Sequence, residues 1–176
     1  MRDPFPQLEH LGDATQFVDR ILDIIQHIRL FEDFNHSEIE MLAGYLRSYR
    51  APAGSVIIAE GEVGARSDFM FLIVSGLCEI VKKDPTGVPK RIGLAGPGKT
   101  LGEMSMIDGE PRFASCLALE ETVFAVLDRD SLSRILAFDS PLGIKILMEL
   151  VLLLSQRLRT SSSKLVNYLD ADPDAS

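Results

Sequence analysis

The first part of the chain, residues 1–47, has the hydrophobic periodicity of helices. Apolar residues recur there at three- and four-residue spacing, which places them on one face of a helix. A second helix is predicted to start at Ser37, because Ser37 and Glu40 have the spacing of a capping box. The apolar faces comprise Phe17, Ile21, Ile24, Ile25 and Ile28 in the first helix, and Ile39, Leu42, Ala43 and Leu46 in the second. We therefore expect an N-terminal helical segment.

The middle part, residues 48–129, changes to short runs of β-type residues. Glycine-containing turns separate these runs, and regularly spaced short strands of this kind are typical of an antiparallel sandwich or roll. No segment between them is long enough for a helical crossover, so a parallel sheet is not expected. The predicted strands cover residues 56–58, 69–74, 78–81, 91–94, 114–119 and 123–127.

The last part, residues 130–169, is predicted to form a short helix over 130–138 and then a long one. Ser140 suits the N-cap of the long helix, with Pro141 at its first helical position. The apolar positions of the long helix follow a heptad repeat with one polar break at Ser161. The repeat consists of Ile144, Val151, Leu158 and Leu165, with Leu147, Leu154, Ser161 and Tyr168 three residues beyond each.

A helix with so many apolar positions should be buried on two sides. One side can pack on the roll, and the other is predicted to pair with a second copy of the chain in a homodimer. The alternative is a single broad contact within one chain. The acidic residues 170–176 are expected to be disordered. The predicted fold class is α+β, mainly β: an antiparallel β-roll or jelly roll flanked by N-terminal helices and a long C-terminal helix.

Composition narrows the class of protein. The net charge of −8 argues against a broad surface for nucleic acid or anionic membranes, because such surfaces need clustered Lys and Arg. Cys78 and Cys116 are too few for an iron–sulfur cluster or a zinc site and fit buried thiols in a reducing compartment. The N-terminus lacks the apolar region of a signal peptide, and the longest apolar run, residues 150–154, is too short to span a membrane. We expect a cytoplasmic protein.

Residues 102–112 carry the candidate chemistry. Gly102 can take a positive φ or let the backbone approach a ligand, and residues 103–107 can form a short helical turn whose N–H groups favour an anion. Glu103 only accepts hydrogen bonds when ionised, which suits a sugar hydroxyl. Arg112 offers a fork of donors that matches phosphate oxygens. The pair is either a salt-bridged surface turn, worth about 0–1 kcal/mol, or a pocket for a small molecule with a hydroxyl and a phosphate.

The order of helices, β-roll and long helix, with this motif late in the roll, resembles the cyclic-nucleotide-binding domains of the catabolite activator protein and protein kinase A regulatory subunit type. The resemblance runs from about Leu30 to Leu165. The strongest part is Gly102-Glu103, eight residues before Pro-Arg-x-Ala. Weaker matching pieces are Leu30-Phe31, Gly54, Glu60-Gly61, residues 70–73, Gly76 and Gly96-Pro97-Gly98.

This resemblance implies a cyclic nucleotide as the ligand, cAMP in the first place and cGMP less so. It assigns Glu103 to the ribose 2′-hydroxyl and Arg112 to an exocyclic phosphate oxygen. It places the phosphate-binding cassette at about residues 101–115. The remaining members of the cassette are Gly102, Met104 and Ser105, which act through backbone groups, and Ala114, which lets the strand approach.

Phe113 departs from the family pattern, in which Ala, Ser or Thr follows the arginine. Phenylalanine has no hydroxyl for the phosphate. In some members of the family threonine at this position goes with cGMP preference, so Phe113 argues against cGMP and leaves cAMP as the default ligand. Strand alternation should turn its ring away from Arg112, which leaves the backbone N–H available to the phosphate. The ring can also crowd the pocket and lower the affinity.

Residues on the roll and on the long helix are expected to meet the base. Ile80 and Ile92 lie at apolar pocket-lining positions of the family. Ser161 and Ser162 match the Thr-Ser pair that meets the adenine in the catabolite activator protein, and Ser162 would serve the ligand of the partner subunit. Alternatively, Ser161 is the polar residue that sets the register of the helix pair, and the two roles are compatible.

The predicted function is a stand-alone cyclic-nucleotide sensor that is not an enzyme. Ligand binding would shift the C-terminal helix and so signal to an unidentified protein partner. DNA binding is not expected, because transcription factors of the family continue into a helix-turn-helix domain where this chain ends. No nucleophile–base constellation is visible, and the three histidines, His10, His27 and His36, all lie in the N-terminal segment. The alternative is a degenerate domain without nucleotide affinity that serves as a dimerising scaffold.

Overall fold

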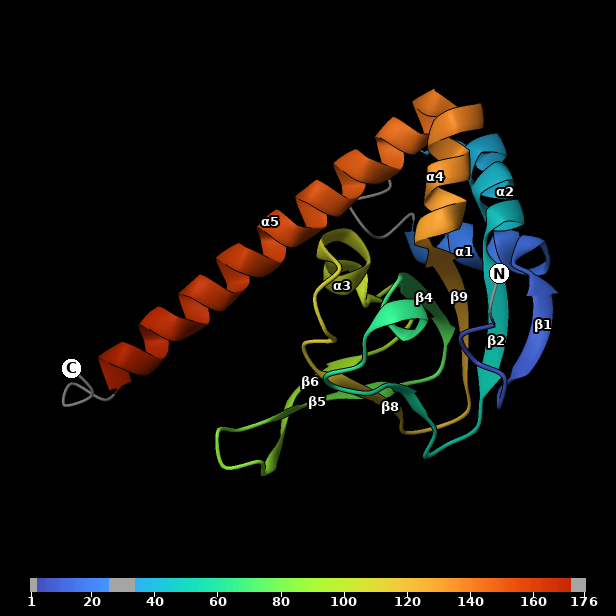
Figure 1. The fold of residues 1–176 in the computed structure, drawn as a ribbon. Coiled ribbons are helices and arrows are strands. Elements are labelled where there is room, and N and C mark those ends of the chain that lie inside the picture. The colour runs from blue at the N-terminus through green and yellow to red at the C-terminus, as the bar shows by residue number, and fades with distance from the viewer. Residues whose placement is uncertain (1–2, 26–33, 172–176) are drawn as a thin grey trace.

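The structure, a computed structural model, describes residues 3–25 and 34–171. They form two antiparallel sheets, with helices over one face of the larger sheet (Figure 1). The strands are β1 (Glu9–Asp13), β2 (Arg47–Ala51), β3 (Val56–Ile58), β4 (Phe69–Ser75), β5 (Cys78–Lys83), β6 (Pro89–Ala95), β7 (Thr100–Leu101), β8 (Ser115–Ala118) and β9 (Thr122–Asp128). The helices are α1 (Val18–Ile25), α2 (His36–Tyr45), α3 (Glu103–Asp108), α4 (Arg129–Phe138) and α5 (Ser140–Ala171). The predicted positions Ile28, Leu30 and Phe31 lie outside the described residues.

The two sheets confirm the predicted antiparallel roll. One has the strand order β1-β2-β9-β4-β7 and the other β3-β8-β5-β6, and neither closes into a barrel. All six predicted strands are present, but β1, β2 and β7 were not predicted. β1 lies within the segment that was expected to be only helical. Its sequence and that of β2 are too polar to show a hydrophobic run, and both strands depend on pairing with their neighbours.

Strand β4 separates two hydrophobic cores. Phe71 and its alternate neighbours face the space between the sheets, whereas Leu72 and its alternate neighbours face the helices. Because both faces of β4 are covered, its sequence is an unbroken apolar run rather than an alternation of apolar and polar residues. Phe5 also enters the core between the sheets, with its ring centroid 4.9 Å from that of Phe69. The N-terminal segment therefore helps to close the roll.

Two helix starts differ from prediction. The N-cap of α2 is Asn35, whose side chain accepts from the N–H of Glu38 while the Glu38 carboxylate accepts from the N–H of Asn35. The Ser37–Glu40 capping box was therefore wrong, because asparagine caps as well as serine and the same spacing occurs two residues earlier. At α5 the carboxylate of Asp139 accepts from the N–H of Leu142. The predicted Ser140 N-cap was also wrong, since its hydroxyl donates to the preceding helix.

The long helix α5 crosses above α3, and its C-terminal half extends past the roll (Figure 1). Leu142, Ile146 and Leu150 are buried in the core that α5 shares with the larger sheet and the other helices. The heptad positions face away from this core: Ile144, Val151, Leu158 and Leu165 are each more than half exposed. The alternative in which the heptad seam packs within one chain is therefore wrong.

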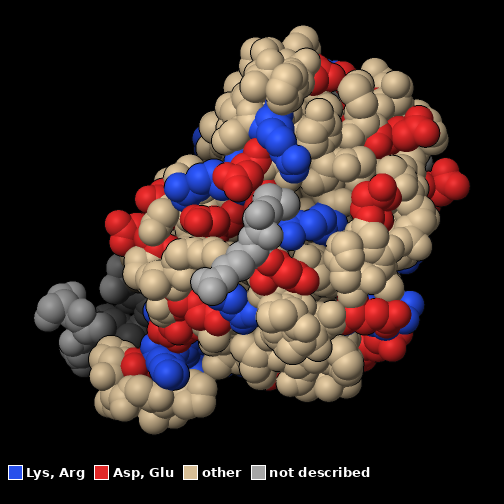
Figure 2. Space-filling model, turned by 45° about the vertical axis from the view of Figure 1, so that its right-hand side comes forward, with Lys and Arg blue, Asp and Glu red and all other residues tan. Residues whose placement is uncertain are grey.

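The surface carries charges of both signs. On the face that Figure 2 shows, acidic and basic side chains lie among one another rather than in separate patches. Within the part of the chain that the structure describes, no helix is long and apolar enough to cross a membrane.

Candidate functional site

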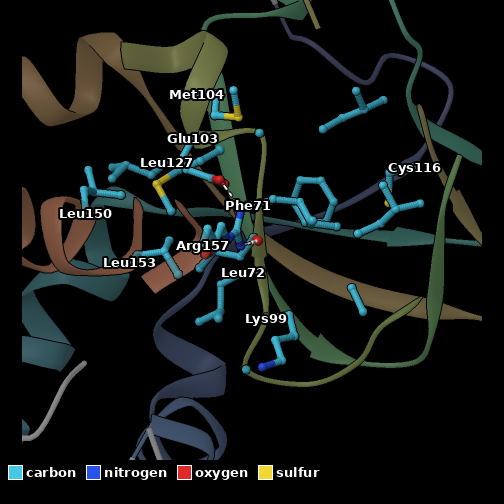
Figure 3. A pocket seen from close by; sticks show the side chains of 18 of the residues that line it. Phe71, Leu72, Lys99, Glu103, Met104, Cys116, Leu127, Leu150, Leu153 and Arg157 are labelled. Atoms are coloured by element: carbon cyan, nitrogen blue, oxygen red, sulfur yellow. Dashed lines mark hydrogen bonds and ion pairs between the residues drawn. The ribbon is translucent and has the colours of Figure 1, made fainter. Parts of the chain in front are cut away.

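One pocket lies between the roll and α5, with a volume of about 660 Å³. Its apolar part is formed by α2, β4, β5, β6 and the start of α5, and its polar part by α3, residues 112–115 and the middle of α5. Figure 3 shows Glu103 and Met104 of α3 on one side of this pocket and Leu150 and Leu153 of α5 on another. Segments that are far apart in the sequence thus surround a single space.

Arg112 is almost completely buried, with 3% of its surface exposed. Its Nε donates to the carbonyl of Arg66 (3.0 Å), Nη1 to that of Gly102 (2.7 Å) and Nη2 to that of Phe69 (2.8 Å). The guanidinium carbon also lies 4.2 Å from the centroid of the Phe69 ring. These bonds use three of the five N–H groups of the guanidinium. Arg112 therefore holds the roll together and keeps two donors for another partner.

Burial also changes the acidity of Arg112. Removal from water disfavours the charged form and lowers the pKa of Arg112 to about 10, against the opposing effect of nearby carboxylates that include Glu62 and Glu103. The guanidinium is still charged near neutral pH. It therefore supplies one positive charge at the edge of a pocket in an acidic protein.

Gly102 makes this arrangement possible. Its φ is +88°, so the structure shows the first of the two roles expected for this glycine, a positive φ. A Cβ at this position would lie 2.6 Å from Nη1 of Arg112 and 2.9 Å from the carbonyl oxygen of Phe69. The absence of a side chain at Gly102 thus lets the guanidinium of Arg112 pack closely against the backbone.

Glu103 is the first residue of α3 and is 1% exposed. Arg157 of α5 donates from Nη1 to its Oε1 and from Nη2 to the carbonyl of Thr100 (Figure 3). The other carboxylate oxygen, Oε2, is buried and has no hydrogen-bond donor among the described residues. Glu103 therefore provides the pocket with a buried anionic acceptor that has capacity left.

Phe113 lies at the edge of the pocket with 55% of its surface exposed. The ammonium of Lys82 lies 4.5 Å from its ring centroid and pairs with Glu60 at 2.7 Å. Glu60 in turn receives the N–H of Lys83, and its own N–H donates to Ser115. The Phe113 ring thus packs on Lys82, whereas the guanidinium of Arg112 packs on the ring of Phe69.

The pocket brings together all the residues predicted for the site except Ser162, which is exposed on α5 and is not part of the pocket wall. Ser105 is buried, and its hydroxyl donates weakly to the carbonyl of Pro111 at 3.4 Å. The candidate site residues that line the pocket are Gly102, Glu103, Met104, Ser105, Arg112, Phe113, Ala114, Ile80, Ile92 and Ser161.

Arg157 is the main contributor that the sequence did not indicate. It also lines the pocket and is the side chain that binds Glu103. Its position was visible in one respect: Arg157 and Ser161 are four residues apart and so share a face of α5. A lone arginine on an exposed helix is nevertheless a common surface residue, and its partner, 54 residues earlier in the chain, could not be identified from spacing.

The chain is similar to known proteins over most of its length. The family model for the cyclic nucleotide-binding domain matches residues 49–139. The chain is 30% identical over 150 residues to the "CRP-like cAMP-activated global transcriptional regulator" of Mycobacterium tuberculosis, covering 85% of this chain and 64% of that protein. It is 34% identical over 112 residues to the cAMP-dependent protein kinase regulatory subunit of Aspergillus fumigatus, covering 64% of this chain and 26% of that protein.

A solved structure matches over nearly the whole chain. The cyclic nucleotide-binding domain from Methylobacillus flagellatus KT superposes with a TM-score of 0.84 at 39% identity, covering 96% of this chain and 93% of that one. The chain therefore spans less than two thirds of the two curated relatives but almost all of this single domain.

Proposed function

Since the chain belongs to the cyclic-nucleotide-binding domain family, we propose that it is a regulatory domain that binds a cyclic nucleotide, cAMP in the first place, in the pocket between roll and α5. The names of two relatives refer to cAMP, which supports cAMP over cGMP. Phe113 argues against cGMP, because it offers no hydroxyl to the ligand, and leaves cAMP as the default. The free thiols of Cys78 and Cys116 fit a cytoplasmic location.

The buried Oε2 of Glu103 is the observation that carries this proposal. A buried acceptor without a donor costs about 1–3 kcal/mol, and a ribose hydroxyl would supply the donor. Arg112 lies beside it, because its Nη1 binds the carbonyl of the preceding Gly102. The two remaining N–H groups of Arg112 suit a phosphate oxygen. A cyclic ribose phosphate carries both groups on one rigid frame.

The same contacts link ligand binding to α5. A hydroxyl that binds Glu103 must share the carboxylate with Arg157 or displace Arg157 from it. Displacement would release α5 from the cassette, whereas a shared carboxylate would hold α5 and the ligand on the same side chain, so that in either case the ligand favours one position of α5 over another. In our proposal a partner protein responds to that position.

The exposed apolar face of α5 supports a homodimer. This face, which we call the seam, consists of Ile144, Leu147, Val151, Leu154, Leu158 and Leu165. Apart from the half-buried Leu154, these residues are 38–69% exposed in the single chain. An exposed apolar stripe at heptad spacing, here with a polar break at Ser161, is typical of a helix that pairs with a second helix. We propose that the second helix is α5 of another copy.

Isothermal titration and thermal unfolding with cAMP and with cGMP test ligand binding. Ligand at 100 times its Kd should stabilise the wild type by about 2.7 kcal/mol. Glu103→Gln removes the charge with little change in size and should weaken cAMP binding about tenfold or more, since bonds to charged groups contribute roughly 1.5–3 kcal/mol. The matched control is Glu110→Gln, an exposed carboxylate of the same segment, which should bind like the wild type.

Two results would count against the proposal. If neither nucleotide at millimolar concentration releases heat or shifts the unfolding temperature, the receptor function is wrong and a dimerising scaffold is favoured. If Glu103→Gln and Glu110→Gln bind cAMP equally well, Glu103 does not contact the ligand.

A further inference from the structure

The wall of the pocket contains a second buried polar atom without a partner. Thr100 lies on the short strand β7, lines the pocket and is 6% exposed. Its hydroxyl oxygen, Oγ1, is buried and has no hydrogen-bond partner among the described residues. Removing a hydroxyl from water in this way costs free energy unless another group binds it. The site described above gives this hydroxyl no role.

Strand pairing turns the Thr100 side chain toward the helices. Thr100 lies opposite Leu72 of β4, and directly opposite residues of an antiparallel pair have their side chains on the same face. Leu72 faces the helices, whereas the next residue of β7, Leu101, faces the core between the sheets together with Phe71. The hydroxyl therefore lies on the face of the sheet that α5 borders.

One guanidinium places Thr100 beside Glu103. Arg157 donates from Nη1 to Oε1 of Glu103 and from Nη2 to the carbonyl of Thr100. The two nitrogens belong to one planar group, so the two acceptors that they bind are neighbours. The side chains of Thr100 and Glu103 are nevertheless not bonded to each other, since Oγ1 and Oε2 both lack a partner among the described residues. Two unsatisfied atoms of neighbouring residues thus border the same pocket.

The two atoms have complementary chemistry. An ionised carboxylate only accepts hydrogen bonds, whereas a threonine hydroxyl can donate one and also accept. A ligand hydroxyl between them can donate its hydrogen to Oε2 of Glu103 and accept the hydrogen of Oγ1 of Thr100. A carbonyl oxygen has no hydrogen for Glu103, and an ammonium group has no lone pair for Thr100. The pair therefore selects a hydroxyl.

We infer that Thr100 is a further specificity-determining residue of the pocket, whose hydroxyl donates to the same ligand hydroxyl that donates to Glu103. This inference rests on the proposed function, in which that group is the 2′-hydroxyl of the cyclic nucleotide. The pocket then recognises ribose through two hydrogen bonds, and a 2′-deoxyribose leaves both buried atoms without a partner.

Thr100→Val tests the contact, because it replaces the hydroxyl by a methyl group of similar size. The hydroxyl has no partner in the free protein, so the variant should unfold at the same temperature as the wild type or at a higher one. Isothermal titration should nevertheless show cAMP binding about fivefold weaker, the effect of one neutral hydrogen bond. Thr100→Ser keeps the hydroxyl and should bind cAMP nearly as the wild type does.

Thr122→Val is the matched control. Thr122 is 0% exposed, its hydroxyl donates to the carbonyl of Glu120 at 3.0 Å, and it is not part of the pocket wall. Its replacement should lower the unfolding temperature and leave cAMP binding unchanged, which is the reverse of the result expected for Thr100→Val. A Thr100→Val variant that unfolds at a lower temperature and binds cAMP like the wild type would overturn the inference, because the hydroxyl would then serve the fold.

Titration with 2′-deoxy-cAMP identifies the ligand atom. Wild type and Thr100→Val should bind this ligand equally well, so the preference for cAMP over 2′-deoxy-cAMP should be about fivefold smaller in the variant. A loss of equal size with both ligands would overturn the shared 2′-hydroxyl. If the wild type does not bind cAMP, the proposed function and this inference fail together. If wild type and Thr100→Val bind cAMP equally well, only this inference fails.

Discussion

The two faces of α5 differ in what covers them, although both are apolar. Leu142, Ile146 and Leu150 are 1–6% exposed and pack into the core of the domain. Val151, directly after Leu150, is 56% exposed, and Leu158 is 69% exposed. The heptad repeat in the sequence belongs to the exposed face, whereas the buried face follows a spacing of four. The more regular apolar pattern is therefore not the one that the chain uses for its own core.

This difference separates two kinds of stability. The buried face contributes to folding of one chain, because its burial needs no partner. The seam can contribute only when a second molecule covers it, so its effect must depend on protein concentration. Substitutions on the buried face should therefore change the free energy of unfolding of one chain, whereas substitutions in the seam should change the dissociation constant of the dimer.

The largest expected effect concerns the seam. Replacing both Leu158 and Leu165 by Asp should abolish the dimer, because burial of each leucine contributes about 1.5–3 kcal/mol, which together raises the dissociation constant at least ~100-fold. Light scattering should give twice the chain mass of 19.4 kDa for the wild type and the single mass for the variant. Ser163→Asp, an exposed change outside the heptad seam, should remain dimeric. A wild type that is monomeric at all concentrations would contradict pairing through the seam.

The next effect concerns the buried face. Leu150→Ala should lower the free energy of unfolding by about 3 kcal/mol, because it leaves a cavity in the core. Val151→Ala, at the next residue, should change it by no more than about 0.5 kcal/mol. Urea unfolding in the Leu158→Asp/Leu165→Asp background measures both without a contribution from dimerisation. Similar losses for the two variants would mean that the two faces are not distinct.

A smaller effect concerns the contact between α4 and α5 near their junction. A Cβ on Gly143 of α5 would lie 2.7 Å from the Leu136 side chain and 3.0 Å from its Cα. Gly143→Ala should destabilise the protein by about 1 kcal/mol net: overpacking against Leu136 costs roughly 1–3 kcal/mol, and helix propensity recovers part of it. Gly44→Ala in α2 is the control, because no atom lies within 4 Å of the added Cβ; it should stabilise the protein by up to about 1 kcal/mol. Thermal unfolding gives the sign of each change, and a stabilising Gly143→Ala would show that the helices separate easily.

The smallest effect is a pH dependence at the edge of the buried face. The ammonium of Lys145 on α5, 2.6 Å from Glu38 on α2, lowers the pKa of the Glu38 carboxyl, and the N–H of Asn35 lowers it further. A lowered folded pKa stabilises the protein above the unfolded value of about 4.3, and this stabilisation is lost as the pH falls through the folded value.

Lys145→Gln should therefore cost less than about 1 kcal/mol at neutral pH and progressively less as the solution is acidified below the usual glutamate range. Urea unfolding of wild type and variant, at neutral pH and again at a pH below the usual glutamate range, measures this difference in stability. A difference that grows on acidification would contradict the assigned pair.

The sequence predicted much of the fold because its core strands are locally distinctive. β4 and β9 are apolar runs bounded by turns, and both were found close to their predicted limits. β1 and β2 were not predicted, since polar and apolar side chains are mixed in both strands. Where each strand begins and ends depends on its pairing with strands that are distant in the sequence. The two misplaced helix caps show a finer limit. Several neighbouring polar residues can cap a helix, and the path of the incoming chain decides which one does.

The candidate site shows the same division. The sequence by itself indicated that Gly102 can take a positive φ or let the backbone approach a ligand, and that a carboxylate and a guanidinium stand at the ends of one short segment. Only the tertiary structure decided their partners. Arg112 binds carbonyls 43 and 46 residues earlier, and Glu103 binds an arginine 54 residues later. Backbone conformation depends on neighbouring residues, whereas hydrogen bonds in a buried pocket depend on which distant segments the packing of the roll and α5 brings within 3 Å.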